Sequence, residues 1–482
     1  MTVSLENAFI DPSCTETYLE KMMKRGRLSF SDIFVNIYGI FSLGVFVLLA
    51  IKDGSVFRRR TREEQEALRK ARHELWAGNE DFRPAFEIVE GQKSLHFISS
   101  GPSDASKDLI VFIHGFPDSC YLWSDILKSP LLLRKARLIA IDLPGSGGSD
   151  SLEQYDAQRM LDAVASFIVN KRKETVASGC RCIVVGHDWG GLLAYRLAAE
   201  LPSLADRFIV VNSAYPTHAK RRITDCVAIA QDRLLQWQHR PLQLHASRQG
   251  ANALRPVVAQ ILKSSYVFIF NLPKTLTDWF GKMGNQFFLR SAHHVAARRS
   301  THLPLPQAAR AMASSLGPSL ENCVERGDYP NSIHQRAKAG AWPERIRLYS
   351  EGLTTGTFDP PHHLRKYVSS VTQSLTTNES GLSDVPEHER LKAPCTVLFG
   401  TQDPALDSRI CLDGVEDYMG PQSQVIRVPH CGHWLPIEPD GHLMVEAVCE
   451  WALDRETEGQ SVSRLRTRLE TLGGVSFQMK SV

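Results

Sequence analysis

The sequence predicts an α/β protein: a mostly parallel sheet flanked by helices, with an inserted helical cap and an N-terminal membrane helix. Short apolar runs rich in β-branched residues alternate with helical patterns over residues 85–213, and such runs return at 395–400 and 424–429. Apolar runs that do not alternate with polar residues are typical of strands covered by helices on both faces. The stretch between them is mostly helical, which indicates an insertion into one sheet.

The amino-acid composition excludes some classes of function for this chain. The 482 residues are 43% hydrophobic and 23% charged, as in folded enzymes. With 56 basic and 53 acidic residues, the formal charge of +3 is too small to hold the whole chain on nucleic acid, so we expect no nucleic-acid partner. Ten scattered cysteines, without paired CxxC spacing, indicate a reducing compartment.

The N-terminal region contains an uncharged apolar stretch over residues 33–51. About 20 such residues cross a bilayer as a helix, so the stretch predicts a single-pass membrane anchor. Its Asn, Gly and Ser residues leave open a buried helix or a helix lying in the interface. A cleaved signal peptide fits less well because the stretch is long and has no small-residue cleavage pattern. Basic residues flank both ends, so the orientation stays open.

The remaining organisation is inferred from pattern changes along the chain. Mixed charges at helical spacing over 61–76 predict a solvated helix within the spacer. The polar end of the chain is expected to be loosely held. The predicted division is an N-terminal segment 1–32, the anchor 33–51, a helical spacer 52–84, a first core half 85–213, a helical cap 214–388, a second core half 389–455 and a tail 456–482.

A candidate nucleophile follows the run CIVV. The sequence Gly186-His187-Asp188-Trp189-Gly190-Gly191 leads directly into a helical pattern. Glycines two positions before and two after a central residue are typical of the nucleophile elbow, a sharp strand-to-helix turn that exposes one side chain. That side chain is Asp188, whose alternative role is a simple helix cap.

A carboxylate nucleophile restricts the reaction. Attack by Asp188 on an alkyl carbon gives an ester whose carbonyl belongs to the enzyme, and water can then cleave it by addition at that carbonyl. A serine would give an ether that water cannot open in this way. Epoxides and alkyl halides are therefore the expected substrates.

The partners of the nucleophile are predicted from position. In the nucleophile–acid–base order, His433 is the expected base, with His430 as the competitor, and Asp403 is the expected acid, with Asp407 as the weaker alternative. The backbone N–H groups of Phe116 and Trp189 are expected to form an oxyanion hole. His114, in the same loop as Phe116, is expected to be structural.

Four motifs together carry a family resemblance: HGFPD at 114–118, GHDWGG at 186–191, GTQDPAL at 400–406 and CGHW at 431–434. The chain over about 85–455 resembles α/β-hydrolase-fold epoxide hydrolases of the membrane-anchored type. The resemblance implies hydrolysis of a lipophilic epoxide to a vicinal diol, without metal or organic cofactor, at a membrane that we expect to be the endoplasmic reticulum. It also implies that Tyr266, in the cap segment SSYVFIFNLP, donates a proton to the epoxide oxygen.

The resemblance fails at a second cap tyrosine. In DPPHHLRKY at 359–367 the expected position is Leu364, and Tyr367 lies three residues later. This departure keeps open the alternative that the chain is a catalytically weakened binding protein with the same fold. A haloalkane dehalogenase is a further alternative, disfavoured because such enzymes commonly resemble HGNP where this chain has HGFP.

Overall fold

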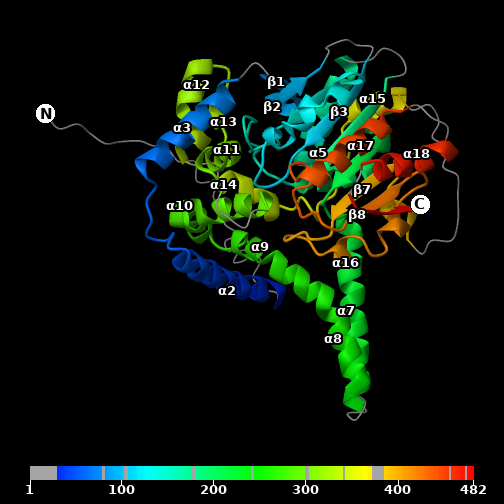
Figure 1. The fold of residues 1–482 in the computed structure, drawn as a ribbon. Coiled ribbons are helices and arrows are strands. Elements are labelled where there is room, and N and C mark those ends of the chain that lie inside the picture. The colour runs from blue at the N-terminus through cyan, green and yellow to red at the C-terminus, as the bar shows by residue number, and fades with distance from the viewer. Residues whose placement is uncertain are drawn as a thin grey trace.

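The computed structural model describes residues 30–482 except for 79–81, 102–106, 175–179, 240–243, 299–302, 340–341, 372–384, 455–457 and 473–474. Figure 1 shows a central sheet with helices on both sides and a separate group of helices beyond one edge of the core. The predicted N-terminal segment 1–32 lies almost wholly outside the described residues.

One nine-stranded sheet forms the core, in the order β1-β2-β4-β3-β5-β6-β7-β8-β9. Strands β3 to β8 are parallel, and β1, β2 and β9 pair antiparallel at the two edges. The predicted α/β class with a mostly parallel sheet is confirmed. The strands are β1 Arg83–Val89, β2 Lys93–Ser100, β3 Asp108–Ile113, β4 Ala136–Ile141, β5 Cys182–His187, β6 Arg207–Val211, β7 Cys395–Gly400, β8 Gln424–Val428 and β9 Gln478–Ser481.

Successive residues of the central strands enter two different cores because strand side chains alternate between faces. Val111 and Val184 pack under α5 and α6, whereas Ile110 and Ile183 pack under α17 and α18. Both faces are therefore covered, as the continuous apolar runs predict. The helices of the core are α4 Pro130–Leu133, α5 Ala157–Glu174, α6 Trp189–Glu200, α16 Ser408–Cys411, α17 Pro439–Ala452 and α18 Glu458–Glu470.

The insertion between β6 and β7 is helical, as expected. Its helices α7 and α8 form a long hairpin that projects from the body (Figure 1). The short 3₁₀ turn η6, Ile346–Tyr349, leads from α14 back over the core. The cap helices are α7 Pro216–His239, α8 Leu244–Lys263, α9 Ser265–Phe270, α10 Lys274–Ala296, α11 Leu305–Leu316, α12 Leu320–Arg326, α13 Asn331–Ala339, α14 Trp342–Arg345 and α15 His362–Val371.

The predicted spacer helix is α3, Arg62–Ala77. Thr61 accepts from the Glu64 N–H while the Glu64 carboxylate accepts from the Thr61 N–H, so a capping box fixes the start of the helix. The helix is only partly solvated, since Trp76 is buried and its indole N–H donates to Ala313 O of α11. The spacer is thus docked on the cap.

In the described part of the tail, α18 and β9 pack on the core, contrary to the expectation of a loosely held tail. Leu465 and Leu469 of α18 are buried in the core cluster that contains α17. Strand β9 then adds to β8 at the sheet edge. The helix was not expected because its sequence is mostly polar, with only two buried leucines one helical turn apart. The strand was not expected because four residues are too few to show a strand periodicity.

The apolar N-terminal stretch forms α2, Phe30–Lys52. Among the described residues it is the one helix long and apolar enough to cross a membrane, by length and composition. Figure 1 shows α2 beside α9 and α10 of the cap. One face of the helix is therefore already occupied by protein.

Candidate active site

Asp188 lies at the turn between β5 and α6, with φ 52° and ψ −115°, a conformation that side-chain-bearing residues seldom adopt. The flanking glycines permit the turn. A Cβ at Gly186 would lie 2.1 Å from Gly190 O, and a Cβ at Gly190 would lie 2.3 Å from Ile113 O. The sequence therefore folds into the expected elbow, and Asp188 is 19% exposed at its tip.

Two backbone N–H groups act on the Asp188 carboxylate. The Phe116 N–H, in the loop after β3, donates to Asp188 Oδ2 at 2.9 Å. The backbone N–H of Trp189, at the start of α6, also lowers the pKa of Asp188. Both groups expected from the sequence as oxyanion donors thus lie near this carboxylate, and its Oδ1 faces His433.

His433 follows β8 and faces Asp188. Its Nε2 lies 3.8 Å from Asp188 Oδ1, and its Nδ1 is 2.7 Å from Asp403 Oδ2. Asp403 is in the loop after β7 and is fully buried at its side chain. Three loops at the carboxyl ends of parallel strands therefore bring the predicted nucleophile, base and acid together.

The two competing residues lie elsewhere. His430 is exposed, three residues before His433. Asp407 caps α16 and forms an ion pair with Arg409 at 2.8 Å. Geometry therefore selects His433 and Asp403.

The environment of Asp403 keeps it ionised. Oδ2 accepts from Asn212 Nδ2 at 2.7 Å in addition to His433, and Oδ1 accepts from the N–H groups of Ala405 and Leu406 at 2.7 and 2.8 Å. Burial alone would raise the pKa of Asp403, but the His433 charge and these hydrogen bonds lower it. Asp403 is thus a fixed anion that orients His433.

The nucleophile and base influence each other. Burial raises the pKa of Asp188, an effect opposed by His433 and by the donors from Phe116 and Trp189. Burial alone would lower the pKa of His433, but the negative charges of Asp403 and Asp188 and the Asp403 hydrogen bond raise it to about 9. Neutralising Asp188 removes one of these charges and so lowers the pKa of His433.

Two neighbouring histidines have structural contacts. His114 bonds Gly115 O through Nδ1 and accepts from the Leu143 N–H through Nε2. His187 donates from Nε2 to the carbonyl of His433 at 2.9 Å. Burial lowers the pKa of His114 to about 4 and that of His187 to about 3, so both stay neutral and fix the loops around the site.

Tyr266 lies on α9, near enough to Asp188 for its charge to act on the phenol. Its ring packs against Phe270 and Phe288, with centroids 5.5 and 5.4 Å apart. Burial first, then the Asp188 charge, raises the pKa of its phenol. The proton is therefore held firmly in the resting site, close enough for the Asp188 charge to act on it.

A second tyrosine, Tyr349 of η6, was missed from the sequence. Its ring stands edge-on to that of Tyr266, with centroids 6.3 Å apart, and the two phenols act on each other's pKa. Its ring stands edge-on to Trp189, with centroids 4.7 Å apart. Burial raises its pKa well above the usual value. Two phenols therefore meet over the elbow.

The two positions considered for a second tyrosine lie outside this group. Leu364 is buried in the core, and Tyr367 packs near α5 with Lys173 Nζ 5.4 Å from its ring centroid. The charged groups acting on Tyr367 are Arg172 and Asp206, near the start of β6, whereas the elbow follows the end of β5. The sequence signal for Tyr349 was weak, because this residue follows a long stretch of the cap in which no motif is recognised.

One buried group of metal-ligand type occurs among the described residues: His96, Cys120 and Asp142. The Asp142 oxygens already accept from His96 Nδ1 and from the Cys120 and Gly148 N–H groups, at 2.7–2.8 Å. These bonds tie the loop after β4 to β2, and we assign the group a structural role.

Comparison with known proteins places this geometry in a family. The model of the alpha/beta hydrolase family matches residues 110–447. The chain belongs to this family. The α/β-hydrolase fold is also that of the Cif epoxide hydrolase from Acinetobacter nosocomialis, with a TM-score of 0.50, 15% identity and coverage of 81% of this chain and 96% of that one.

Two curated α/β-hydrolase relatives align over part of the chain. Epoxide hydrolase 1 of Caenorhabditis elegans is 31% identical over 186 residues, 38% of this chain and 41% of its own. A haloalkane dehalogenase of Psychrobacter cryohalolentis is 32% identical over 145 residues, 28% of this chain and 45% of its own. The chain thus spans less than half the length of each.

Proposed function

We propose that this protein hydrolyses a lipophilic epoxide to a vicinal diol through an alkyl ester on Asp188. The observation that carries the proposal is the pair of neighbouring phenols, Tyr266 and Tyr349, on which the charge of the Asp188 carboxylate acts. Phenols supply the proton that an epoxide oxygen needs when its ring opens, whereas a leaving halide needs none. The name of the Caenorhabditis elegans relative agrees with this chemistry.

In the first step, Asp188 Oδ1 attacks a ring carbon of the epoxide. The C–O bond of the ring breaks, and its oxygen takes a proton from Tyr266 or Tyr349. Oδ2 becomes the carbonyl oxygen of the new ester while it stays near the Phe116 N–H. The elbow holds the carboxylate in position for this attack.

In the second step, water attacks the ester. Esterification removes the negative charge of Asp188, which lowers the pKa of His433 and frees it to act as a base. His433 takes a proton from water, and the hydroxide adds to Asp188 Cγ while Asp403 stabilises the imidazolium. The negative charge on Oδ2 is stabilised by the Phe116 and Trp189 N–H groups. Collapse breaks the Cγ–Oδ1 bond, and the leaving alkoxide takes the proton of the added hydroxyl group, which gives the diol and restores the carboxylate. His433 then returns the proton that it took from water to the phenolate.

Labelling with heavy-oxygen water tests the ester route. In a single turnover in H₂¹⁸O, label enters the Asp188 peptide and the diol carries none; in the next turnover label appears in the diol. Direct attack of water on the epoxide would instead label the first diol and leave Asp188 unlabelled. Peptide and product mass spectrometry separate the two outcomes.

The dehalogenase alternative is tested with the same preparation. Another relative is named haloalkane dehalogenase, and a carboxylate nucleophile is expected for that reaction too. Phe116 places an aromatic ring at the position where an amide would face a halide. We therefore expect no halide release from 1-bromoalkanes at enzyme concentrations that hydrolyse an aromatic epoxide.

Membrane attachment is a further part of the proposal. The length and apolarity of α2 support attachment, and a membrane-bound enzyme has direct access to lipophilic substrates. The sequence favours a single pass at the endoplasmic reticulum. Fractionation of expressing cells, with markers for each membrane, tests the compartment.

A further inference from the structure

Helix α2 packs on the cap along one narrow face. Its buried residues Gly39, Ser42, Leu43 and Ala50 recur every three or four positions, the spacing of one helix face. The contact is close, because a Cβ at Gly39 would lie 2.7 Å from Phe268 O of α9. Small residues on this face thus fit α2 to the cap backbone.

This contact extends along most of the helix. Near its beginning, Tyr38 stands edge-on to Phe268, with centroids 4.7 Å apart. Past its middle, Phe46 packs on Phe280 and Phe288, at 5.4 and 5.7 Å. The helix therefore lies against the cap rather than leading away from it.

The opposite face of α2 is apolar and exposed. Its side chains form a continuous strip, 39–66% exposed, along the length of the helix, where a water-facing helix carries polar residues. The strip comprises Ile33, Phe34, Ile37, Ile40, Phe41, Val45, Leu48, Leu49 and Ile51.

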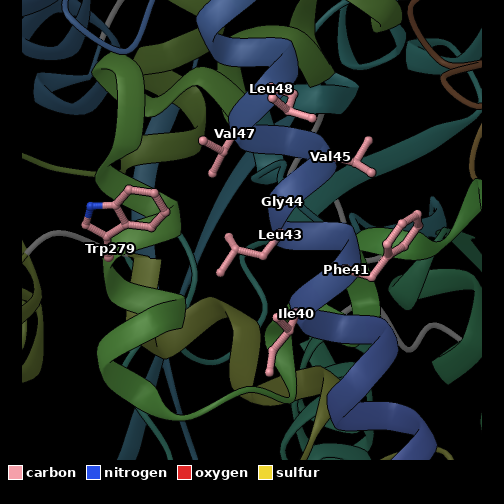
Figure 2. Close-up of a pocket in the computed structure, with 8 residues that line it drawn as sticks. All are labelled: Ile40, Phe41, Leu43, Gly44, Val45, Val47, Leu48 and Trp279. Atoms are coloured by element: carbon pink, nitrogen blue, oxygen red, sulfur yellow. The ribbon is translucent and has the colours of Figure 1, made fainter.

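A shallow groove of about 650 Å³ lies between this helix and Trp279 of α10. Figure 2 shows Leu43 and Val47 directed toward Trp279, while Phe41 and Val45 point to the other side. Trp279 is 48% exposed. Half-exposed tryptophans beside apolar surface are typical of membrane–water interfaces.

Positive charge gathers at the end of the strip. Lys52, Arg58, Arg59 and Arg62 are exposed there, next to Phe57, which is 87% exposed. Asp53 is an acidic neighbour in this turn, and Glu64 is paired with Arg58. Such a cluster matches anionic lipid headgroups.

The contacts with the cap decide the orientation of α2. At 1.5 Å per residue the helix is about 34 Å long, enough to cross a bilayer. If it crossed, α9 and α10 would enter the hydrocarbon with it. The ion pair of Lys274 with Asp278 and the exposed Lys282 would then lie inside the membrane.

We propose that α2 lies in the plane of an anionic bilayer, with its outer strip and the Trp279 groove buried in one leaflet and the basic cluster at the headgroups. Interfacial helices insert only to the boundary of headgroups and acyl chains, so the charged residues of α10 stay in water. This arrangement replaces the single pass that the sequence favours.

Topology of the unaltered sequence tests the orientation. In sealed microsomes that bear the full chain with a tag at each end, a protease is expected to remove both tags from the same side. Protection of one tag and loss of the other would show that α2 crosses the membrane and would overturn the proposal.

Vesicle flotation tests the surface. The full chain is expected to float with phosphatidylcholine–phosphatidylserine vesicles. Replacing Ile40 and Leu48 together by Glu should lower the bound fraction at least tenfold. The matched control is Val324→Glu, on α12, where Val324 is 75% exposed and distant from α2; it should bind as the parent does.

Folding and self-association are measured alongside. Equal melting temperatures and equal hydrolysis of a water-soluble epoxide by parent and variants establish that loss of flotation comes from the surface. Flotation unchanged by the double substitution would contradict the proposal. A second result would also contradict it: a parent chain that does not bind vesicles but forms a dimer, which the double substitution dissociates. In that case a second copy of the chain would cover the strip.

Discussion

At the residue scale, Tyr349 carries the sharpest prediction. Tyr349→Phe removes the hydroxyl group beside Tyr266 while it keeps the ring that packs on Trp189. We expect this substitution to lower the rate of ester formation about 10²-fold, as when one proton donor is lost. Tyr266→Phe should lower the same rate at least as much. Tyr367→Phe is the matched control and should leave the rate unchanged. Equal effects at Tyr349 and Tyr367, measured by single-turnover kinetics, would remove Tyr349 from the site.

The same residues show what sequence can predict. Asp188 and its glycines form a contiguous motif, because the elbow is a local backbone structure. The position of His433 and Asp403 beside Asp188 could be predicted because each follows a strand, and parallel strands end at one edge of a sheet. Tyr349 does not follow a strand or belong to a motif that would predict its position. It reaches the site through the packing of a long helical insertion, which no local pattern encodes.

At the element scale, two cap helices support the oxyanion loop. Arg345 of α14 donates to Pro117 O at 2.9 Å, and Ser315 of α11 donates to the same oxygen at 2.7 Å. Pro117 follows Phe116, whose N–H holds Asp188. We expect Arg345→Met to reduce kcat about tenfold and to change KM little, because a misplaced donor weakens charge stabilisation in both steps. Partial rescue by Arg345→Lys is expected, and an unchanged kcat in Arg345→Met would contradict this role.

The strands that were missed lie at the sheet edges. The inner strands are buried on both faces, so their apolar runs mark them clearly. Strand β1 has the mixed sequence RPAFEIV, and β9 has only four residues. Helix α3 was expected, but its docking on α11 depends on Leu75 and Trp76 at its end, within a mostly charged sequence.

At the scale of the whole molecule, buried histidines set the response to acid. Burial lowers the pKa of His114, His187 and His293 to about 4, 3 and 4, below the ordinary 6.5. The unfolded chain therefore binds more protons, and stability falls as pH drops from about 6.5 toward 4. Asp118, whose pKa burial raises to about 6, offsets part of this loss. His293→Gln should flatten the pH dependence of the unfolding free energy in urea over this range; an unchanged slope would contradict it.

Alkaline pH acts on stability through His433. The pKa of His433 is raised to about 9, so its contribution to stability is complete below about 6.5 and is lost as pH rises through about 9. Maximal stability is therefore expected near pH 6.5. Urea unfolding of His433→Gln should show no such decline between pH 7 and 9, and a decline equal to that of the parent would assign it to other groups.

The central claim, attack by Asp188 on carbon, is tested most directly by trapping the ester. His433→Gln keeps the nucleophile and the phenols but lacks the base that activates water. Intact-protein mass spectrometry after incubation with an aromatic epoxide should show a gain of one substrate mass, located on the Asp188 peptide. An unmodified His433→Gln protein, under conditions where the parent converts the epoxide to diol, would contradict the account.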